Sequence, residues 1–227
     1  MKNLQIGELK VGDNPIKRES EVKNLGLLME EKLTWESNTT KNIQRAYSKL
    51  KEFYKYQKLF SLKTKTRLVE SFVLSQLTYG DIVTQGMAIS QKQRIQKVQN
   101  SCLRYIFGLR KYDHITPYLH QQDTLNMDRR VRSHALTMLH KTVNGIAPVY
   151  LTEKLTYRHN THNHNTRNRN TLNVRRLHTA KKNGAFFVKT VNEYNTLITN
   201  GTVTQNDKIE AFKSKIVKVL KTESRTE

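Results

Sequence analysis

Cations are the residues that carry most of the chemistry in this sequence. Of its 227 residues, 40 are Lys or Arg and 19 are Asp or Glu, so the formal net charge is +21 at pH 7. The excess is concentrated, because residues 37–112 contain fifteen cations and three carboxylates. A concentrated excess of this kind indicates a surface that binds a polyanion, and nucleic acids and acidic substrates are the leading candidates.

Many cations in this stretch recur every three or four residues, on the side of the predicted helices opposite the apolar residues. Residues at these spacings share one helix face. A face that was only solvated would mix both signs of charge. We therefore expect these faces to bind the phosphate backbone of nucleic acid with little sequence specificity. The expected contacts are Lys41, Arg45, Lys49, Lys63, Lys65, Arg67, Arg94, Lys97, Arg104, Arg110 and Lys111.

Carboxylates that could hold catalytic magnesium are not grouped in the sequence. Nucleic-acid polymerases and nucleases need two or three converging carboxylates, whereas the only adjacent pair here, Glu30-Glu31, is expected in an exposed turn. No glycine-rich phosphate loop precedes a helix, and no serine lies in a nucleophile-elbow pattern. We predict no catalytic residue and no cofactor, so the chain as it stands is not expected to be an enzyme.

Histidine and cysteine give no metal site. His159, His162 and His164 lie in a polar stretch with no carboxylate nearby to orient the rings, which favours a solvated basic arm over a metal site. The one cysteine, Cys102, falls on an apolar helix stripe and is expected to be buried. A single cysteine excludes a disulfide framework and fits an intracellular protein of the nucleus or cytoplasm. With no apolar run of 18 residues, no membrane contact is expected.

The residue pattern predicts a mainly α fold with an N-terminal β-hairpin. Residues 1–36 have strand-like runs at 4–11 and 22–28, separated by the turn signal of residues 12–15. Apolar spacing then predicts helices over about 38–59, from Ser61 to Gly80, 90–107 and 127–143, which would form an antiparallel bundle within 37–156. Residues 157–185, rich in Asn, His, Thr and Arg, are expected to be a flexible basic linker before C-terminal helices in 186–227.

Several short motifs occur in order over most of the chain. They are Leu25-Gly26, Leu33-Thr34-Trp35, Tyr79-Gly80-Asp81, Gln99-Asn100, Arg104-Tyr105-Ile106-Phe107-Gly108, Arg129-Arg130, Asn144-Gly145, Ala147-Pro148 and Tyr194-Asn195. In type and order these motifs resemble the reverse transcriptases of jockey-type non-LTR retrotransposons.

The resemblance implies an identity for each part of the chain. Residues 1–36 would be a hairpin remnant of the polymerase palm, and 37–156 the helical thumb and connection, which follows a template-primer duplex through its backbone. The catalytic aspartates and their magnesium would belong to a palm upstream of residue 1. The hairpin would then contact that missing palm or another protein. Two alternatives stay open: a protein-interaction module that uses the apolar side of the hairpin and Trp35, and a non-functional remnant of a transposable element.

Overall fold

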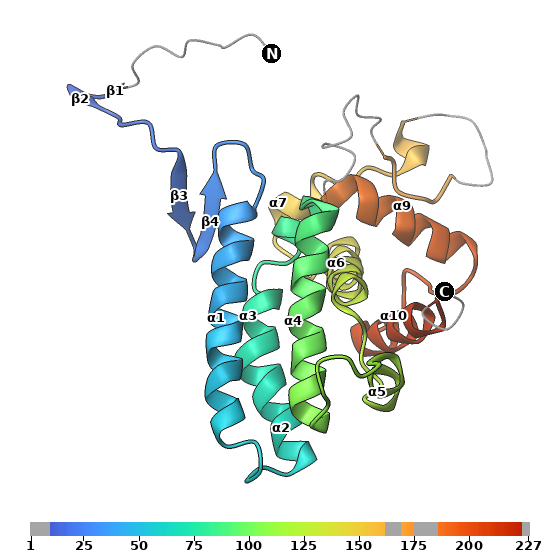
Figure 1. Cartoon of the computed structure of the whole chain (residues 1–227). Helices are drawn as coiled ribbons and strands as arrows, with labels where there is room; N and C mark the ends of the chain where they lie inside the picture. Colours follow the sequence, from blue (N-terminus) through green and yellow to red (C-terminus); the bar gives the residue numbers. More distant parts are fainter. Residues whose placement is uncertain (1–9, 162–168, 175–185, 224–227) are drawn as a thin grey trace.

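A layer of three helical segments forms the first half of the protein (Figure 1). The computed structural model describes residues 10–161, 169–174 and 186–223. The middle segment is one continuous helix whose π-helical turn, η1, adds a bulge between two α-helical parts. The three segments are α1 (Glu36–Lys55), the run of α2 (Leu62–Val69), η1 (Glu70–Leu74) and α3 (Ser75–Thr78), and α4 (Ile89–Phe107).

The first core lies between these three segments, as the apolar spacing predicts. It contains Ala46 and Leu50 from α1, Val73 from the middle segment, and Val98 and Cys102 from α4. Cys102 is buried, and this burial raises the pKa of its thiol to about 12. The expectation of a buried cysteine on the inward stripe is confirmed.

A second core joins α6 (Met127–Val143) to the C-terminal helices α9 (Phe186–Thr199) and α10 (Ile209–Glu223). The first half of α6 contacts the first layer, and in Figure 1 this helix runs across the other three segments. The expected mainly α fold is confirmed, but the apolar face of α6 is completed by α9 and α10, which lie outside the predicted bundle of 37–156. Short helices lie in the connections between these elements: η2 (Val83–Gly86), α5 (Thr116–Gln121), α7 (Val149–Thr152) and η3 (Arg158–Asn160).

A buried histidine fixes the centre of the second core. The ring of His140 stacks on Phe212 at 3.9 Å, and its Nε2 lies 2.8 Å from the carbonyl oxygen of Asp207. Because that oxygen can only accept, Nε2 donates to it, and Nδ1 lies 3.0 Å from the Tyr194 hydroxyl. The polar atoms of this ring are thus satisfied inside the protein.

Part of the expected linker at 157–185 is instead packed against the second core. Leu172 is buried in it, and its backbone exchanges two hydrogen bonds with the side-chain amide of Asn195 on α9, at 3.0 and 2.8 Å. An isolated bridge also pairs Leu172 with Tyr157. The composition gives no sign that Leu172 packs here, because a single leucine among polar residues shows no apolar periodicity. Residues 162–168 and 175–185 lie outside the described residues.

The N-terminal region contains two short hairpins, and their pairing differs from the one expected. Strand β1 (Lys10–Val11) pairs with β2 (Asn14–Pro15), and β3 (Glu21–Asn24) pairs with β4 (Leu27–Glu30). The run at 22–28 was expected to be one strand but turns at Leu25-Gly26, where φ is +45° and +86°. Both residues thus adopt the left-handed conformation of a tight primed hairpin turn.

Two motifs of the resemblance meet at this turn. The Tyr79 hydroxyl donates to the Leu25 carbonyl oxygen at 2.6 Å. A Cβ at Gly80 would lie 2.8 Å from the tip of the Leu27 side chain, and φ at Gly80 is +67°, a left-handed conformation that favours glycine. The hairpin therefore rests on the helical layer.

Trp35 is only 7% exposed, so this side chain packs inside the protein, and the alternative of a protein-interaction module on the hairpin stays a prediction. Trp35 is the residue before α1, with φ +65° and no side-chain cap.

Candidate nucleic-acid interface

A group of cations without ion pairs to described carboxylates lies at one end of the first layer. The end of α1, the start of α2 and the end of α4 meet there, at the lower end of Figure 1. We call this group the basic end. None of its members makes an ion pair with a carboxylate that the structure describes. It consists of Lys58, Lys63, Lys65, Arg67, Arg104, Arg110 and Lys111.

Tyr105, which is fully buried, joins the three segments at this end. The Tyr54 ring packs edge-on against it, with ring centroids 5.2 Å apart, and the Lys65 ammonium lies 5.9 Å from the centre of its ring. The Gln57 side-chain amide also donates to the Tyr105 carbonyl oxygen at 2.9 Å. The segments that carry the cations of the basic end are therefore held together by the contacts of Tyr105.

The loop after α4 is held by its own hydrogen bonds. Gly108, with φ +70°, ends the helix as the sequence predicts. The Arg104 guanidinium then donates through Nε to the Arg110 carbonyl oxygen at 3.3 Å, and the Arg110 N–H donates to an Asp113 carboxylate oxygen at 2.7 Å. Arg110 and Lys111 are therefore presented from a closed turn.

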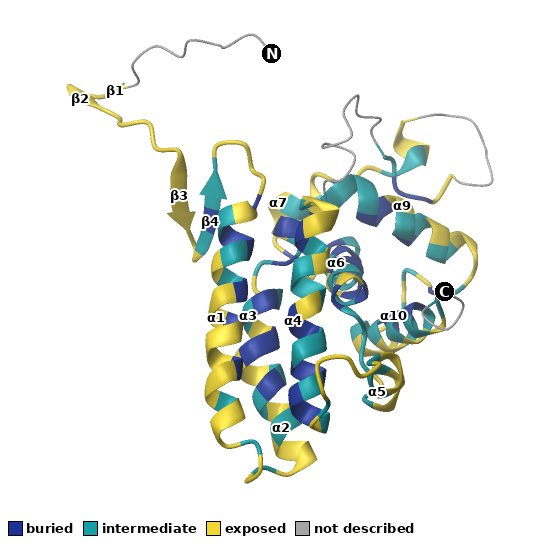
Figure 2. Ribbon diagram, viewed as in Figure 1, coloured by how far each residue is buried: buried dark blue, intermediate teal, exposed yellow. Residues whose placement is uncertain are grey.

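Exposed tyrosines accompany these cations. Tyr54 is 44%, Tyr56 52% and Tyr112 85% exposed. The Lys111 ammonium lies 5.4 Å from the centre of the Tyr112 ring, within the range of a cation–π contact. Figure 2 shows this end of the layer largely in the colour of exposed residues. The spacing of Tyr54, Tyr56 and Tyr112 along the chain gives no sign of this grouping, because only the fold brings the three rings to one end.

Lys41, Arg45 and Lys49, which we call the α1 stripe, do not join the basic end or the cations of α4. Thr40 of α1 contacts Arg94 of α4, and the α1 stripe is rotated from Thr40 by about 100–180° at 100° per residue. These three side chains are exposed on another side of the helix. The structure thus separates residues that the sequence grouped as one surface.

On α4 the predicted contacts divide into paired and unpaired cations. Arg94 forms an ion pair with Glu36 and donates to the Thr40 hydroxyl at 2.9 Å. Hydrogen bonds from Gln91 and then Arg94 lower the pKa of the Glu36 carboxyl. Lys97 is exposed without an ion pair to a described carboxylate, about 10 Å along the same face from Arg104. Lys97 therefore extends the basic end, whereas Arg94 joins α4 to α1.

Carboxylates pair with two cations of α6, Arg130 and Arg132. Arg130 makes a two-pronged contact with Glu70 at 2.8 and 3.0 Å, and Arg132 pairs with Glu193 at 2.7 Å and Glu223 at 2.8 Å. These pairs tie α6 to the first layer, to α9 and to α10.

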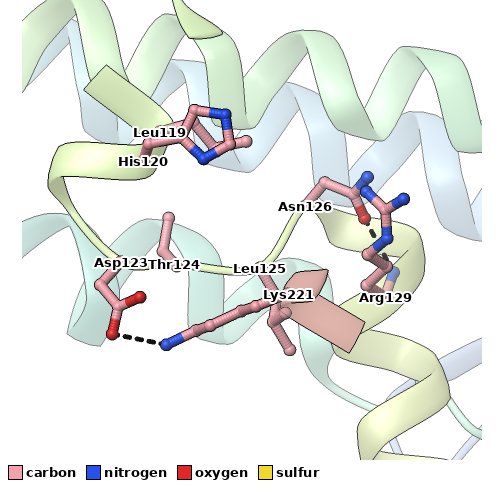
Figure 3. A pocket seen from close by; sticks show the side chains of 8 residues that line it. All are labelled: Leu119, His120, Asp123, Thr124, Leu125, Asn126, Arg129 and Lys221. Carbon is pink, nitrogen blue, oxygen red and sulfur yellow. Dashed lines mark hydrogen bonds and ion pairs between the residues drawn. The ribbon is translucent and has the colours of Figure 1, made fainter. Parts of the chain in front are cut away.

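A small pocket between α5, α6 and α10 is lined by several polar groups (Figure 3). Lys221 reaches from α10 to Asp123 and pairs with it at 2.5 Å. The Asn126 side chain accepts from the Arg129 N–H at 2.9 Å and so caps α6. These polar groups therefore hold secondary structure together.

The described residues contain no group of three His, Cys, Asp or Glu side chains placed to bind a metal ion. Of the three histidines at 159–164, only His159 is described; its ring stacks on Tyr157 at 5.4 Å. His162 and His164 lie outside the described residues. The structure describes no helix with the length and apolar character needed to cross a membrane.

Comparisons of the chain with protein-family models, with curated proteins and with solved structures found no match. The resemblance to jockey-type reverse transcriptases therefore stays a prediction from motifs.

Proposed function

We propose that this protein binds nucleic acid through its sugar-phosphate backbone, with the basic end and Lys97 as the contact surface. The observation that carries the proposal is the set of seven cations gathered at one end of the helical layer without a described carboxylate partner. Backbone contacts by Lys and Arg release counterions from the polyanion, which supplies affinity with little dependence on base sequence.

Two features favour a phosphate ligand over a face that is merely solvated. Carboxylates are present nearby but are already engaged: Glu52 pairs with Lys55, and Asp113 accepts from the backbone of Arg110. The guanidinium groups of Arg67, Arg104 and Arg110 also offer the planar donors suited to phosphate oxygens.

The motif resemblance supports a more specific proposal, in which the chain is the C-terminal part of a non-LTR reverse transcriptase and the duplex is its template-primer. The first layer would then be the thumb. In this proposal the chain contributes duplex binding and no catalytic group, and RNA–DNA hybrids should bind at least as tightly as DNA duplexes of the same sequence.

The test is a pair of triple variants with the same change in charge. The basic-end variant carries Lys58→Glu, Lys63→Glu and Lys111→Glu, and the control variant carries Lys41→Glu, Arg45→Glu and Lys49→Glu in the α1 stripe. None of the six side chains forms an ion pair with a described residue. The net charge falls by the same amount in both variants, so the variants differ only in where the charge is changed.

We expect the basic-end variant to bind a duplex of about 20 base pairs roughly 10- to 100-fold more weakly in fluorescence anisotropy at about 0.1 M salt. The control variant should stay within about threefold of the wild type. Circular dichroism should show the same helix content in all three proteins. Equal losses in the two variants would mean that total charge, and not the basic end, determines binding.

A further inference from the structure

We propose that the basic end binds nucleic acid with unpaired bases, and that Tyr56 and Tyr112 stack on those bases. The inference rests on the proposed function, because the cations of the basic end would hold the backbone of the same strand. A strand held at its phosphates leaves its bases free to meet neighbouring aromatic rings.

The exposure of these two rings is the first argument. Tyr112 is 85% exposed and Tyr56 is 52% exposed, although a tyrosine ring is largely apolar and usually packs against the protein. Neither hydroxyl makes a hydrogen bond to another described residue. Their rings thus do little for the fold and offer apolar area beside cations.

Their rigid attachment is the second argument. Tyr56 follows the last residue of α1, and its N–H donates to the Phe53 carbonyl oxygen at 3.1 Å. Tyr112 lies in the turn that two hydrogen bonds between Arg110 and Asp113 close, at 2.7 and 3.3 Å. A ring on a fixed backbone loses little conformational entropy when a base stacks on it.

The neighbouring cations are the third argument. Lys111 lies over the Tyr112 ring, and Lys58 is two residues beyond Tyr56. Aromatic rings interleaved with cations are the arrangement by which proteins bind single strands without reading their sequence. A paired duplex exposes base faces only at its ends, so a single strand is the ligand that uses both kinds of group.

The experiment compares a labelled single strand of about 12 nucleotides with the same strand annealed to its complement. The double variant Tyr56→Ala, Tyr112→Ala should bind the single strand at least about tenfold more weakly and the duplex within about twofold of the wild type. Tyr56→Phe, Tyr112→Phe should retain single-strand binding, because stacking needs the ring and not the hydroxyl. DNA and RNA strands should show the same loss, since stacking makes no use of the 2′-hydroxyl.

The control is Tyr150→Ala, which removes a tyrosine that is 61% exposed on α7, outside the basic end. It should leave both affinities unchanged. Unchanged single-strand binding by the Tyr56, Tyr112 double variant would overturn the stacking inference, and so would equal losses for strand and duplex. If the triple Lys58, Lys63, Lys111 reversal leaves both ligands bound as before, the proposed function itself fails, so the two failures are distinct.

Discussion

The Lys65 ammonium lies 5.9 Å from the centre of the Tyr105 ring, which places the start of α2 against the end of α4. Tyr54 of α1 packs edge-on against the same ring. The buried Tyr105 therefore brings together the start of α2 and the ends of α1 and α4, which are far apart in the sequence. Because Tyr105 also belongs to the first core, the basic end is built on that core.

Arg94 and Lys97 are one helical turn apart and should behave differently when replaced. Arg94→Ala should lower the free energy of unfolding by about 0.5–1 kcal/mol, because it removes a partly exposed ion pair with Glu36 and a hydrogen bond to Thr40. Lys97→Ala should leave stability unchanged and weaken duplex binding severalfold. Urea denaturation and anisotropy measure the two effects. Combined with Glu36→Ala, Arg94→Ala should cost less than it does alone, and strict additivity would contradict the pairing.

Leu25→Asn should stabilise the β3–β4 hairpin. Leu25 is 85% exposed, and its φ of +45° is one that asparagine tolerates much better than leucine. The substitution would create an Asn-Gly pair in a primed turn, for which we expect a gain of about 0.5–1 kcal/mol in the free energy of unfolding. Thermal denaturation measures it. Leu25→Val is the control and should destabilise the protein, since a β-branched side chain resists positive φ. If the Val variant were more stable than the Asn variant, the turn would not be of this type.

Asp207 should make stability fall at low pH. Hydrogen bonds from Lys215 and then from the Thr204 N–H lower the pKa of its carboxyl to about 2. A carboxyl whose pKa is lower in the folded than in the unfolded state stabilises the fold above its unfolded pKa of about 4, and this contribution disappears as pH falls towards 2. Relative to the wild type, Asp207→Asn should therefore lose about 1–2 kcal/mol at pH 6 and almost nothing near pH 2.

Urea unfolding of both proteins at several pH values measures this difference. The pH must be kept in the range where unfolding is reversible. A difference between wild type and Asp207→Asn that stays constant from pH 6 to pH 2 would contradict the lowered pKa.

The regular helices could be predicted because each carries a periodic apolar stripe and a recognisable end. For α4 and α6 the expected ranges agree with the structure within a residue, and Gly108 ends α4 as expected. The pairing of β3 with β4 could not be predicted, because Leu25 is a leucine in a position that favours asparagine or glycine. The anchoring of Leu172 depends on Asn195, a contact between residues 23 apart that leaves no local pattern.

For the candidate site, composition located the positive charge but not its partners. Residues such as Arg94 and Lys97 look equivalent on a helical wheel, yet only Arg94 has Glu36 within reach, through the packing of α4 against α1. The separation of the α1 stripe from the basic end also follows from packing, which decides which helix faces meet. Pairing of this kind depends on tertiary contacts that the spacing along one helix does not contain.

The central claim is that the cations of the basic end neutralise nucleic-acid phosphates. The most direct test is the slope of log association constant against log salt concentration for a DNA duplex, measured for the wild type and for the Lys58→Glu, Lys63→Glu, Lys111→Glu variant. Each phosphate contact contributes about 0.9 to this slope, so the variant should show a slope shallower by roughly 2.7, while the α1-stripe control keeps the slope of the wild type. An unchanged slope in the basic-end variant, or the same shallower slope in the control, would contradict the claim.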